Sequence, residues 1–337
     1  MIKKVRCALI GMGNVGKNLL KIINENKIRY MNNYNIDLIF TEIFEYDGAL
    51  ITNNENGLNL EVILNCKNIR ELPEWNNGLM AKDYITNMNA EIVIDATPVN
   101  HKTGEPALSH IIKSLENKKH VITSNKAPFY LKYKDIIDLA KKNKVFVGFE
   151  STVMSAVPCI ALKNTLAGNR IKKIIGVLNG TTNFILDRMT NEGIDFDLAL
   201  KEAQELGFAE ADPSLDIDGY DAAGKLVILA NHLMGWNKTI NDVNISGITN
   251  INKDMIELAK QDNKVIKHLA IAKDDKLEVS LKLIDKDSPL SVSRNYNGLY
   301  IDTEYAGEMV FTGRGAGGSE AAAGIISDLI NICNNLK

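Results

Sequence analysis

Residues 5–16 read VRCALIGMGNVG and join a short apolar run to the spacing Gly-x-Gly-x-x-Gly. The segment Asn14–Ile23 then places apolar residues at helical spacing, so a strand, a glycine turn and a helix are expected in succession. In this spacing the first glycine permits the turn, the second lets a pyrophosphate approach the backbone, and the third allows close helix packing. The stretch predicts a dinucleotide site formed by Gly11, Gly13, Asn14, Val15 and Gly16.

Strand and helix patterns alternate over about the first 150 residues. Strands are expected at Asp37–Phe44, Glu91–Ala96, His120–Thr123 and Val145–Glu150, and helices near Glu105–Glu116 and Tyr133–Lys142. Strands that alternate with helices are typical of an α/β fold with a parallel, doubly wound sheet of the Rossmann type. Residues 1–150 are therefore predicted to form a dinucleotide-binding domain.

The pattern changes after Glu150. Helical spacing at 156–167, 183–191, 195–206 and 221–234 accompanies strand-like segments at 171–178 and 265–284. A glycine-rich segment from Gly313 and a helix at Ala321–Asn331 close the chain. Residues 151–304 are predicted to form a second, α+β domain.

The composition of the 337-residue chain narrows the classes of protein. Its 39 basic and 42 acidic residues give a formal net charge of −3, and no run of Lys or Arg suits a nucleic-acid arm, so no nucleic-acid partner is expected. The apolar stretches are shorter than a membrane span and no signal peptide is recognisable, which favours a cytoplasmic protein with no membrane partner. The cysteines lack a CxxC pair and fit reduced core thiols: Cys7, Cys66, Cys159 and Cys333.

Three loops of the first domain should face the dinucleotide. Glu45 follows the second expected strand, where an acid can hold ribose hydroxyls, although it equally fits a solvated loop acid. Because no Arg or Lys lies between residues 36 and 60, the sequence favours NAD over NADP. Thr97 follows the third strand, and Ser124 and Lys126 follow the fourth, where they could contact the nicotinamide half and the substrate. Each loop alone also fits a helix cap.

The densest cluster of charge lies between Glu210 and Lys225. Asp221 and Lys225 are four residues apart at the start of a largely apolar helix, so they share one face. A surface ion pair is the common explanation of this spacing, but an apolar helix favours a half-buried pair at a cleft, where a lysine can transfer protons. The surrounding carboxylates suit a substrate that carries a free ammonium group.

Two polar turns could bind anions. Asn179, Gly180 and Thr182 lie between an expected strand and helix, where their amides and hydroxyls could hold a carboxylate or merely cap the helix. The second turn, Gly313–Ser319, precedes the last helix and lacks the GK[ST] ending of a P-loop, which disfavours a nucleotide hydrolase.

Six motifs in order resemble the homoserine dehydrogenase family. They are GMGNVG (11–16), TSNKAP (123–128), FESTVMSAVP (149–158), GVLNGTTNFIL (176–186), ELGFAEADPSLDIDGYDAAGKLVILA (205–230) and GRGAGGSEAAAG (313–324). The resemblance implies an NAD(P)-dependent oxidoreductase that interconverts L-homoserine and L-aspartate 4-semialdehyde in threonine, methionine and isoleucine biosynthesis. It also implies a homodimer formed through the second domain, and residues 305–337 completing the first.

Residue by residue, the resemblance implies roles in the reaction. Lys225 matches the family's proton-donating lysine, Asp221 its acidic partner, and Lys126 a lysine near the reacting carbon and the coenzyme. Glu210 and Asp216 match residues that hold the amino-acid end of the substrate, to which we add Asn179, Gly180 and Thr182. The matching nucleotide-contacting loops contain Gly13, Val15, Thr97, Ser124 and Gly317.

The resemblance further implies a site for Na+ or another monovalent cation. Carbonyl oxygens at Glu150 and Val153 would form most of it, with Ser155 and Val157 completing the set. The sequence departs from the family pattern here, since Met154-Ser155-Ala156 replaces a glycine-rich turn. A second departure places Ser319 and Glu320 where a threonine usually precedes alanine, which alters the contact on the nicotinamide side.

Two other functions would account for part of the sequence. Another amino-acid semialdehyde oxidoreductase could use a nucleophilic cysteine, but Cys159 has no histidine near it in the sequence and resembles a core residue. An NAD-binding regulatory protein would need an effector module, and none is visible in the sequence. This function would also leave the charged cluster between Glu210 and Lys225 unexplained. Because the chain stops soon after the last helix, we expect no appended domain that senses threonine.

Overall fold

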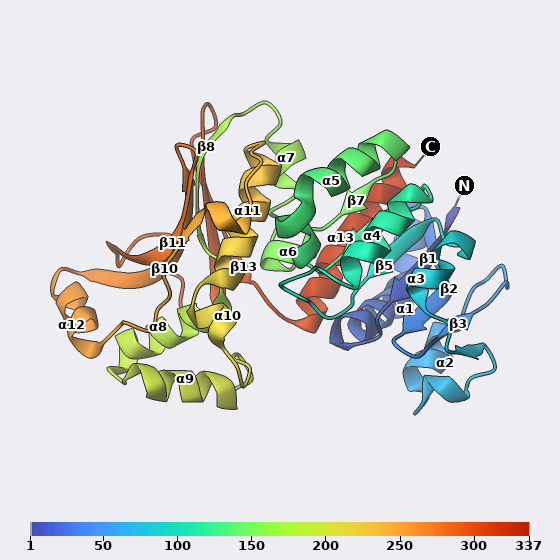
Figure 1. Cartoon of the computed structure of the whole chain (residues 1–337), viewed down its shortest axis with the longest axis horizontal. Helices are drawn as coiled ribbons and strands as arrows, with labels where there is room; N and C mark the ends of the chain where they lie inside the picture. The colour runs from blue at the N-terminus through green and yellow to red at the C-terminus, as the bar shows by residue number, and fades with distance from the viewer. Residues whose placement is uncertain (1, 337) are drawn as a thin grey trace. The chain divides into compact units, whose positions relative to one another are not determined.

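The computed structural model describes residues 2–336, and the chain divides into two compact units (Figure 1). Unit 1 is the chain up to Ser155 together with the segment from Gly317 onward, and unit 2 is Ala156–Ala316. The chain returns to unit 1 at Gly317, later than the position 305 expected from the sequence, because the intervening residues form a strand of unit 2. Among the described residues, no helix is long and apolar enough to cross a membrane.

Unit 1 contains a seven-stranded sheet in the order β4-β3-β2-β1-β5-β6-β7. Strands β2, β1, β5, β6 and β7 are parallel to one another. Strands β3 and β4 continue the sheet beyond β2 and pair antiparallel. The bounds are β1 Lys3–Ile10, β2 Ile36–Glu45, β3 Gly48–Ile51, β4 Trp75–Asn77, β5 Ile92–Asp95, β6 His120–Thr123 and β7 Val147–Gly148. A doubly wound sheet is thus confirmed, and the short β3 and β4 were not foreseen.

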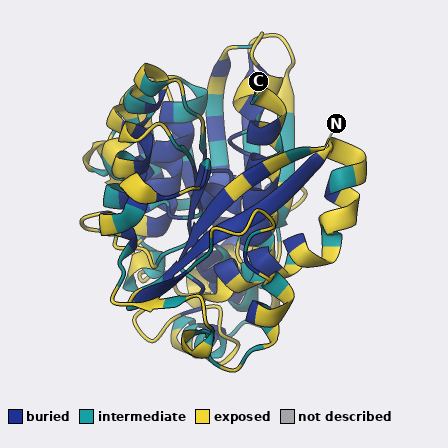
Figure 2. Cartoon of the chain, turned by 90° about the vertical axis from the view of Figure 1, so that its right-hand side faces the viewer, coloured by how far each residue is buried: buried dark blue, intermediate teal, exposed yellow. Residues whose placement is uncertain are grey.

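Side chains of β1 alternate between two apolar layers, as a strand covered on both faces requires. Val5 and Leu9 belong to one cluster with Leu19 of α1 and Leu329 of α13, whereas Ala8 belongs to another with residues of α3. Figure 2 shows the strands dark blue over much of their length, with yellow on the outer faces of helices. The helices of unit 1 are α1 Asn14–Tyr34, α2 Leu60–Asn65, α3 Ala81–Tyr84, α4 Ala107–Glu116, α5 Ala127–Asn143, α6 Ser151–Met154 and α13 Gly318–Asn335.

Unit 2 is built on a six-stranded sheet in the order β13-β12-β8-β10-β11-β9, antiparallel except for the β11–β9 pair. Its strands are β8 Ile171–Val177, β9 Val243–Ile245, β10 Lys264–Lys273, β11 Lys276–Asp285, β12 Tyr296–Thr303 and β13 Glu308–Arg314. Its helices are α7 Leu162–Thr165, α8 Gly180–Glu192, α9 Phe196–Glu205, α10 Ser214–Ile217, α11 Tyr220–Leu233 and α12 Lys253–Gln261. Helix α11 is buried continuously from Asp221 to Asn231, which is what its nearly uninterrupted apolar sequence requires.

Two segments of unit 2 differ from the sequence prediction. The strand-like stretch 265–284 is a hairpin, because Asp274 and Asp275 both adopt positive φ, of 50° and 61°, and reverse the chain between β10 and β11. The helix expected at 156–167 is reduced to α7, with Pro158 in the irregular segment before it.

Candidate active site

The glycine loop of unit 1 has the geometry that a pyrophosphate needs. Gly11 has φ +96°, and a Cβ built on it would lie 2.8 Å from the carbonyl oxygen of Ala96. A Cβ on Gly16 would lie 2.2 Å from the oxygen of Gly11, so the helix packs tightly against the loop. A Cβ on Gly13 would meet nothing within 4 Å. The space beside Gly13, at the N-terminus of α1, therefore has room for the phosphate group that the sequence predicts there.

Glu45 lies at the carboxyl end of β2 and contacts this loop directly. Its Oε1 accepts a hydrogen bond of 3.1 Å from the amide of Met12. Next to it, Arg70 donates to both carboxylate oxygens of Asp47, at 2.7 and 2.9 Å, and its guanidinium carbon lies 5.6 Å from the Tyr46 ring centroid. The Arg70 hydrogen bond lowers the pKa of Asp47. The sequence did not indicate Arg70, because it lies beyond Leu60 and is brought to Asp47 only by folding.

The loops after β5 and β6 lie at the same edge of the sheet. Thr97 donates through its hydroxyl to Oδ1 of Asp95 at 2.8 Å, and the amide of Ser124 donates to the carbonyl of Asp95 at 3.2 Å. The side-chain amide of Asn125 donates to the carbonyl of Pro98 at 3.2 Å and so links the two loops. Lys126 follows as the N-cap residue of α5 and is half-buried.

Gly317 is brought to the glycine loop by packing of α13 against α1. A Cβ on Gly318 would lie 2.7 Å from the side-chain carbon of Asn14, and Ser319 donates to the side chain of Asn18 at 3.0 Å. Gly317 itself has φ +134°, a conformation that favours glycine. The N-termini of α1 and α13 therefore lie side by side, with Gly13 and Gly317 as their N-cap residues.

Lys225 and Asp221 form a buried ion pair in unit 2. Their exposed fractions are 8% and 5%, and the Lys225 Nζ lies 2.8 Å from Oδ2 of Asp221 and 2.8 Å from the carbonyl oxygen of Leu178. An ammonium has three N–H donors, of which these contacts use two. The surface-pair explanation of this spacing is therefore wrong, and the pair is more deeply buried than the half-buried pair that the sequence favours.

Asn179 joins the ion pair to a second carboxylate. Its Nδ2 donates to Oδ2 of Asp221 at 2.9 Å and to Oδ1 of Asp216 at 2.6 Å, while its Oδ1 accepts from the amide of Thr182. Burial raises the pKa of Asp216, and the nearby Asp221 charge adds to this. The polar turn therefore acts both as the helix cap and as part of the charged cluster.

The remaining substrate candidates differ in exposure. Thr182 is 1% exposed and its hydroxyl donates to the carbonyl of Asn179, which is a capping contact. Gly180 is half-buried. Glu210 is exposed, two residues after Phe208, whose carbonyl accepts a hydrogen bond of 2.7 Å from Thr181. Glu210 thus belongs to a loop that is attached to the polar turn.

The residues of the expected cation site fall in two units. Glu150, Val153 and Ser155 belong to unit 1 and are buried, whereas Val157 belongs to unit 2. Ser155 has φ +55°, and its carbonyl packs against Gly324 of α13. Within residues 2–336 no group of three or more His, Cys, Asp and Glu side chains could hold a metal ion.

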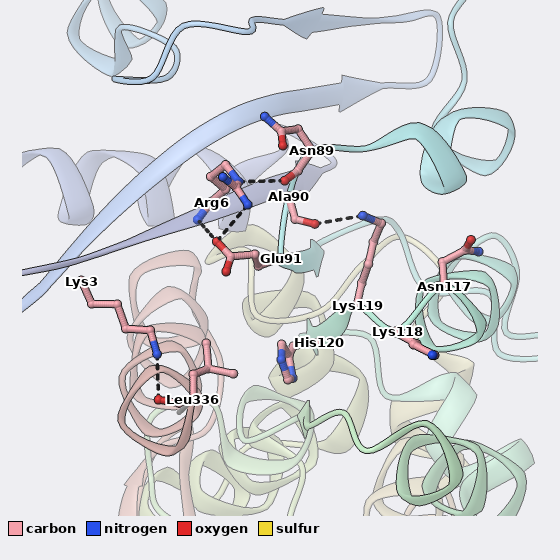
Figure 3. A pocket seen from close by; sticks show the side chains of 10 residues that line it. All are labelled: Lys3, Arg6, Asn89, Ala90, Glu91, Asn117, Lys118, Lys119, His120 and Leu336. Carbon is pink, nitrogen blue, oxygen red and sulfur yellow. Dashed lines mark hydrogen bonds and ion pairs between the residues drawn. The ribbon is translucent and has the colours of Figure 1, made fainter.

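A pocket of about 410 Å³ lies at the amino ends of the unit 1 strands, opposite the glycine loop (Figure 3). It is lined at the amino ends of β1, β5 and β6, where Lys3 donates to the carbonyl of Leu336 and Lys119 to those of Met88 and Ala90. Lys3 thus binds the C-cap carbonyl of α13, where a cation stabilises the helix, and Lys119 binds carbonyls of the segment that leads into β5. These lysines therefore have a structural explanation, and the pocket is not the coenzyme site.

Cys159 does not suit a nucleophile. It is 0% exposed, whereas a nucleophilic thiol has to reach its substrate. The fold does bring a histidine close, because Nε2 of His232 lies 3.0 Å from the carbonyl of Ile160, a proximity that the sequence did not reveal. Burial lowers the pKa of His232 to about 3.

A glycine loop with room for a pyrophosphate and a buried lysine–carboxylate pair are features expected of an NAD(P)-dependent oxidoreductase. The comparisons with known proteins identify the family. The family description "Homoserine dehydrogenase, NAD binding domain" matches residues 11–150, and "Homoserine dehydrogenase" matches residues 158–330. The chain belongs to the homoserine dehydrogenase family, which acts on the CH–OH group of its substrate with NAD or NADP.

Individual relatives agree over nearly the whole chain. A homoserine dehydrogenase of Methanocaldococcus jannaschii is 44% identical, with 98% of each chain covered. An NAD(+)-dependent homoserine dehydrogenase of Pseudomonas canavaninivorans is 35% identical over 97% of this chain and 96% of its own. Among solved structures, a homoserine dehydrogenase described as putative, from Archaeoglobus fulgidus, has a TM-score of 0.89 and 32% identity, covering 97% and 99% of the two chains. A hyperthermophilic archaeal homoserine dehydrogenase in complex with NADPH has a TM-score of 0.85, 28% identity and 99% coverage of both chains.

Proposed function

We propose that Lys225 transfers the proton when this chain interconverts L-homoserine and L-aspartate 4-semialdehyde. The observation that carries the proposal is the buried ammonium, held 2.8 Å from both Asp221 and the carbonyl of Leu178. The bound nicotinamide would supply the hydride chemistry. In aldehyde reduction the third N–H of Lys225 would donate to the carbonyl oxygen and stabilise the developing alkoxide, and in the reverse direction neutral Lys225 would accept the hydroxyl proton.

Asp221 would keep Lys225 in position for this transfer. Because Asp221 is itself held by Asn179, the carboxylate cannot swing away without breaking that hydrogen bond. Asp216 and Glu210 would hold the substrate ammonium, and the turn at Asn179 and Gly180 its carboxylate, with Thr182 supporting the turn. Lys126 of unit 1 would act near the reacting carbon.

In unit 1, the coenzyme would be held by the glycine loop (Gly11, Gly13, Asn14, Val15, Gly16), by Glu45, Thr97 and Ser124, and by Gly317. We infer a preference for NAD. Glu45 would accept from the ribose hydroxyls and repel a 2′-phosphate, and the basic residue nearby, Arg70, is already paired with both oxygens of Asp47.

A homodimer formed by unit 2 fits an open face of its sheet. Ile271, Ile175, Tyr300 and Val310 are register partners across β10, β8, β12 and β13, and all are only partly buried. Their neighbours in the strands, such as Ile174 and Leu299, are fully buried on the other face. A half-exposed apolar row across four strands suits a second copy of the same sheet.

Two finer expectations complete the proposal. The protein would act in the cytoplasm, where its thiols stay reduced. A monovalent cation such as Na+ would bind carbonyl oxygens near Glu150 and Val153, with Ser155 and Val157 as further candidates.

The function is tested by supplying L-homoserine with either NAD or NADP and following absorbance of the reduced nicotinamide. We expect reduction of both coenzymes, with a higher kcat/KM for NAD. The absence of homoserine-dependent absorbance with either coenzyme would contradict the proposal. A higher kcat/KM for NADP would contradict only the assignment of Glu45.

A further inference from the structure

Asp95 is a buried carboxylate, 0% exposed, at the carboxyl end of β5. Its Oδ1 accepts from both the amide and the hydroxyl of Thr97, at 3.2 and 2.8 Å. Its Oδ2 lies 2.8 Å from Nδ1 of His110, a residue of α4 that is 6% exposed. Both oxygens are thus used within unit 1, and none of the roles described so far accounts for this arrangement.

These contacts fix the direction of the Thr97 hydrogen bond. A carboxylate oxygen only accepts, so the hydroxyl of Thr97 donates its single proton to Asp95. Nδ1 of His110 likewise carries the proton that it shares with Oδ2, which holds the plane of the carboxylate and keeps Oδ1 toward Thr97. The hydroxyl oxygen of Thr97 then has only lone pairs left. It can serve a ligand as an acceptor and not as a donor.

Thr97 lies at the switch point of the sheet, where α/β folds bind their ligands. The neighbouring strands β1 and β5 are the place where the strand order reverses. A Cβ on Gly11 would lie 3.2 Å from the amide nitrogen of Thr97, so this loop borders the glycine loop directly. Thr97 is half-buried, and Asn125 holds its carbonyl from the β6 side at 3.4 Å. The hydroxyl is therefore oriented by Asp95, on a half-buried residue that borders the glycine loop.

The nicotinamide end of the coenzyme belongs on this side of β1. Glu45 lies beyond β2, on the other side, so a coenzyme with its ribose at Glu45 and its pyrophosphate at the glycine loop extends toward β5 and β6. The nicotinamide carboxamide offers an NH2 donor and a carbonyl acceptor. We propose that Asp95 and His110 orient Thr97 so that its hydroxyl oxygen accepts a hydrogen bond from the carboxamide NH2.

This inference rests on the coenzyme placement of the proposed function and adds a specific contact to it. Thr97 would touch the coenzyme, whereas Asp95 and His110 are positioning residues that act through Thr97. The contact would set the orientation of the carboxamide, with its NH2 group and not its carbonyl facing β5.

The test compares two reduced coenzymes that differ at this group alone. In reduced 3-acetylpyridine adenine dinucleotide a methyl group replaces the NH2, so the carbonyl remains and the donor is lost. Dissociation constants of this analogue and of NADH are measured by calorimetry without substrate. The proteins are the wild type, Thr97→Val, Thr97→Ser, Asp95→Asn and His110→Gln. Thr103→Val is the matched control, because Thr103 is an exposed threonine of the same loop that accepts from the amide of Glu105.

We expect Thr97→Val to weaken NADH binding about five- to tenfold, the size of one hydrogen bond, and to change analogue binding less than about twofold. Thr97→Ser keeps the hydroxyl and should match the wild type. Asp95→Asn and His110→Gln should each reduce the preference for NADH over the analogue, because Thr97 is then no longer restricted to accepting. Thr103→Val should change neither constant.

Equal weakening of both coenzymes by Thr97→Val, or weakening of neither, would overturn the proposal. An unchanged preference in both Asp95→Asn and His110→Gln would overturn the positioning role. Failure of the wild-type protein to bind NADH at all would instead contradict the proposed function, so the two failures are distinguishable.

Discussion

The proposed sites of the two units are built from different kinds of groups. The proposed coenzyme site of unit 1 consists largely of main-chain groups, with Gly11 in the glycine loop and Gly13 and Gly317 as the N-cap residues of α1 and α13. The proposed catalytic site of unit 2 consists of buried charged side chains, in which Lys225 pairs with Asp221. A main-chain site depends on the absence of side chains, whereas an ionic site depends on their identity. A main-chain site is therefore damaged by adding atoms, and an ionic site by removing charge.

Each unit also contains a buried ionisable group with a shifted pKa, and the two groups change the stability with pH in opposite directions. Burial raises the pKa of Asp328 in unit 1 to about 8 and lowers that of Lys267 in unit 2 to about 8. Asp328 holds its proton in the folded protein but loses it on unfolding between about pH 4 and 8, so its contribution to stability falls as pH rises through that range. The contribution of Lys267 to stability rises with pH between about pH 8 and 10.5, because unfolding takes up a proton in that range.

Among variants outside the proposed catalytic pair, the largest effect is expected on self-association, which we assign to unit 2 alone. Tyr300→Glu places a charge in the middle of the half-exposed apolar row. Burying an unpaired carboxylate is costly, so we expect the dimer dissociation constant to rise about a hundredfold in sedimentation experiments. Tyr46→Glu, at an exposed tyrosine of unit 1, is the matched control. Equal dimerisation of both variants would place the interface elsewhere.

The pH dependence of stability tests the buried lysine. Methionine cannot titrate, so the free energy of unfolding of the wild type minus that of Lys267→Met should rise by about 2 kcal/mol between pH 7.5 and 10. Denaturant titrations at several pH values measure this difference. Lys267 also donates to Asn183 at 2.8 Å, so the variant should be less stable throughout, but a constant offset without pH dependence would contradict the shifted pKa.

The glycine loop offers a pair of variants that separates binding from packing. Gly13→Ala has room within the protein but intrudes on the pyrophosphate, so NADH binding should weaken about tenfold while Tm stays unchanged. Gly16→Ala would bring a methyl group to 2.2 Å from the Gly11 oxygen and should lower Tm as well. Calorimetry and thermal unfolding measure the two effects. A lower Tm for Gly13→Ala alone would contradict this division.

The smallest effect concerns coenzyme choice. Asp47→Asn removes the carboxylate that pairs with Arg70 and should improve kcat/KM for NADP about fivefold, because the guanidinium becomes available to a 2′-phosphate. Glu74→Gln is a control, an exposed acid of unit 1 outside this pair. No gain for NADP would show that Arg70 does not reach the 2′ position.

The sequence predicted those parts of the molecule that local patterns encode. The glycine loop, β6 and the pairing of Asp221 with Lys225 follow from short spacings, and all three are present. Contacts between residues far apart in the chain escaped prediction. Arg70 reaches Asp47 only through folding, and Asp95 meets His110 only because α4 packs beside β5.

Boundaries were predicted less well where turn chemistry decides them. The stretch 265–284 alternates like a single strand, and only the positive φ values of Asp274 and Asp275 turn it into a hairpin. The strands β12 and β13 went unpredicted, although their pairing in unit 2 sets the point at which the chain returns to unit 1.

The most direct test of the central claim measures two quantities in Lys225→Met. These are kcat for homoserine oxidation and the dissociation constant of NADH, with Lys238→Met as a control because Lys238 is an ion-paired lysine of the same unit. We expect kcat to fall about a thousandfold and NADH binding to stay within about twofold of the wild type, while the control keeps both. A kcat within tenfold of the wild type would contradict the assignment of Lys225 as the proton-transfer group.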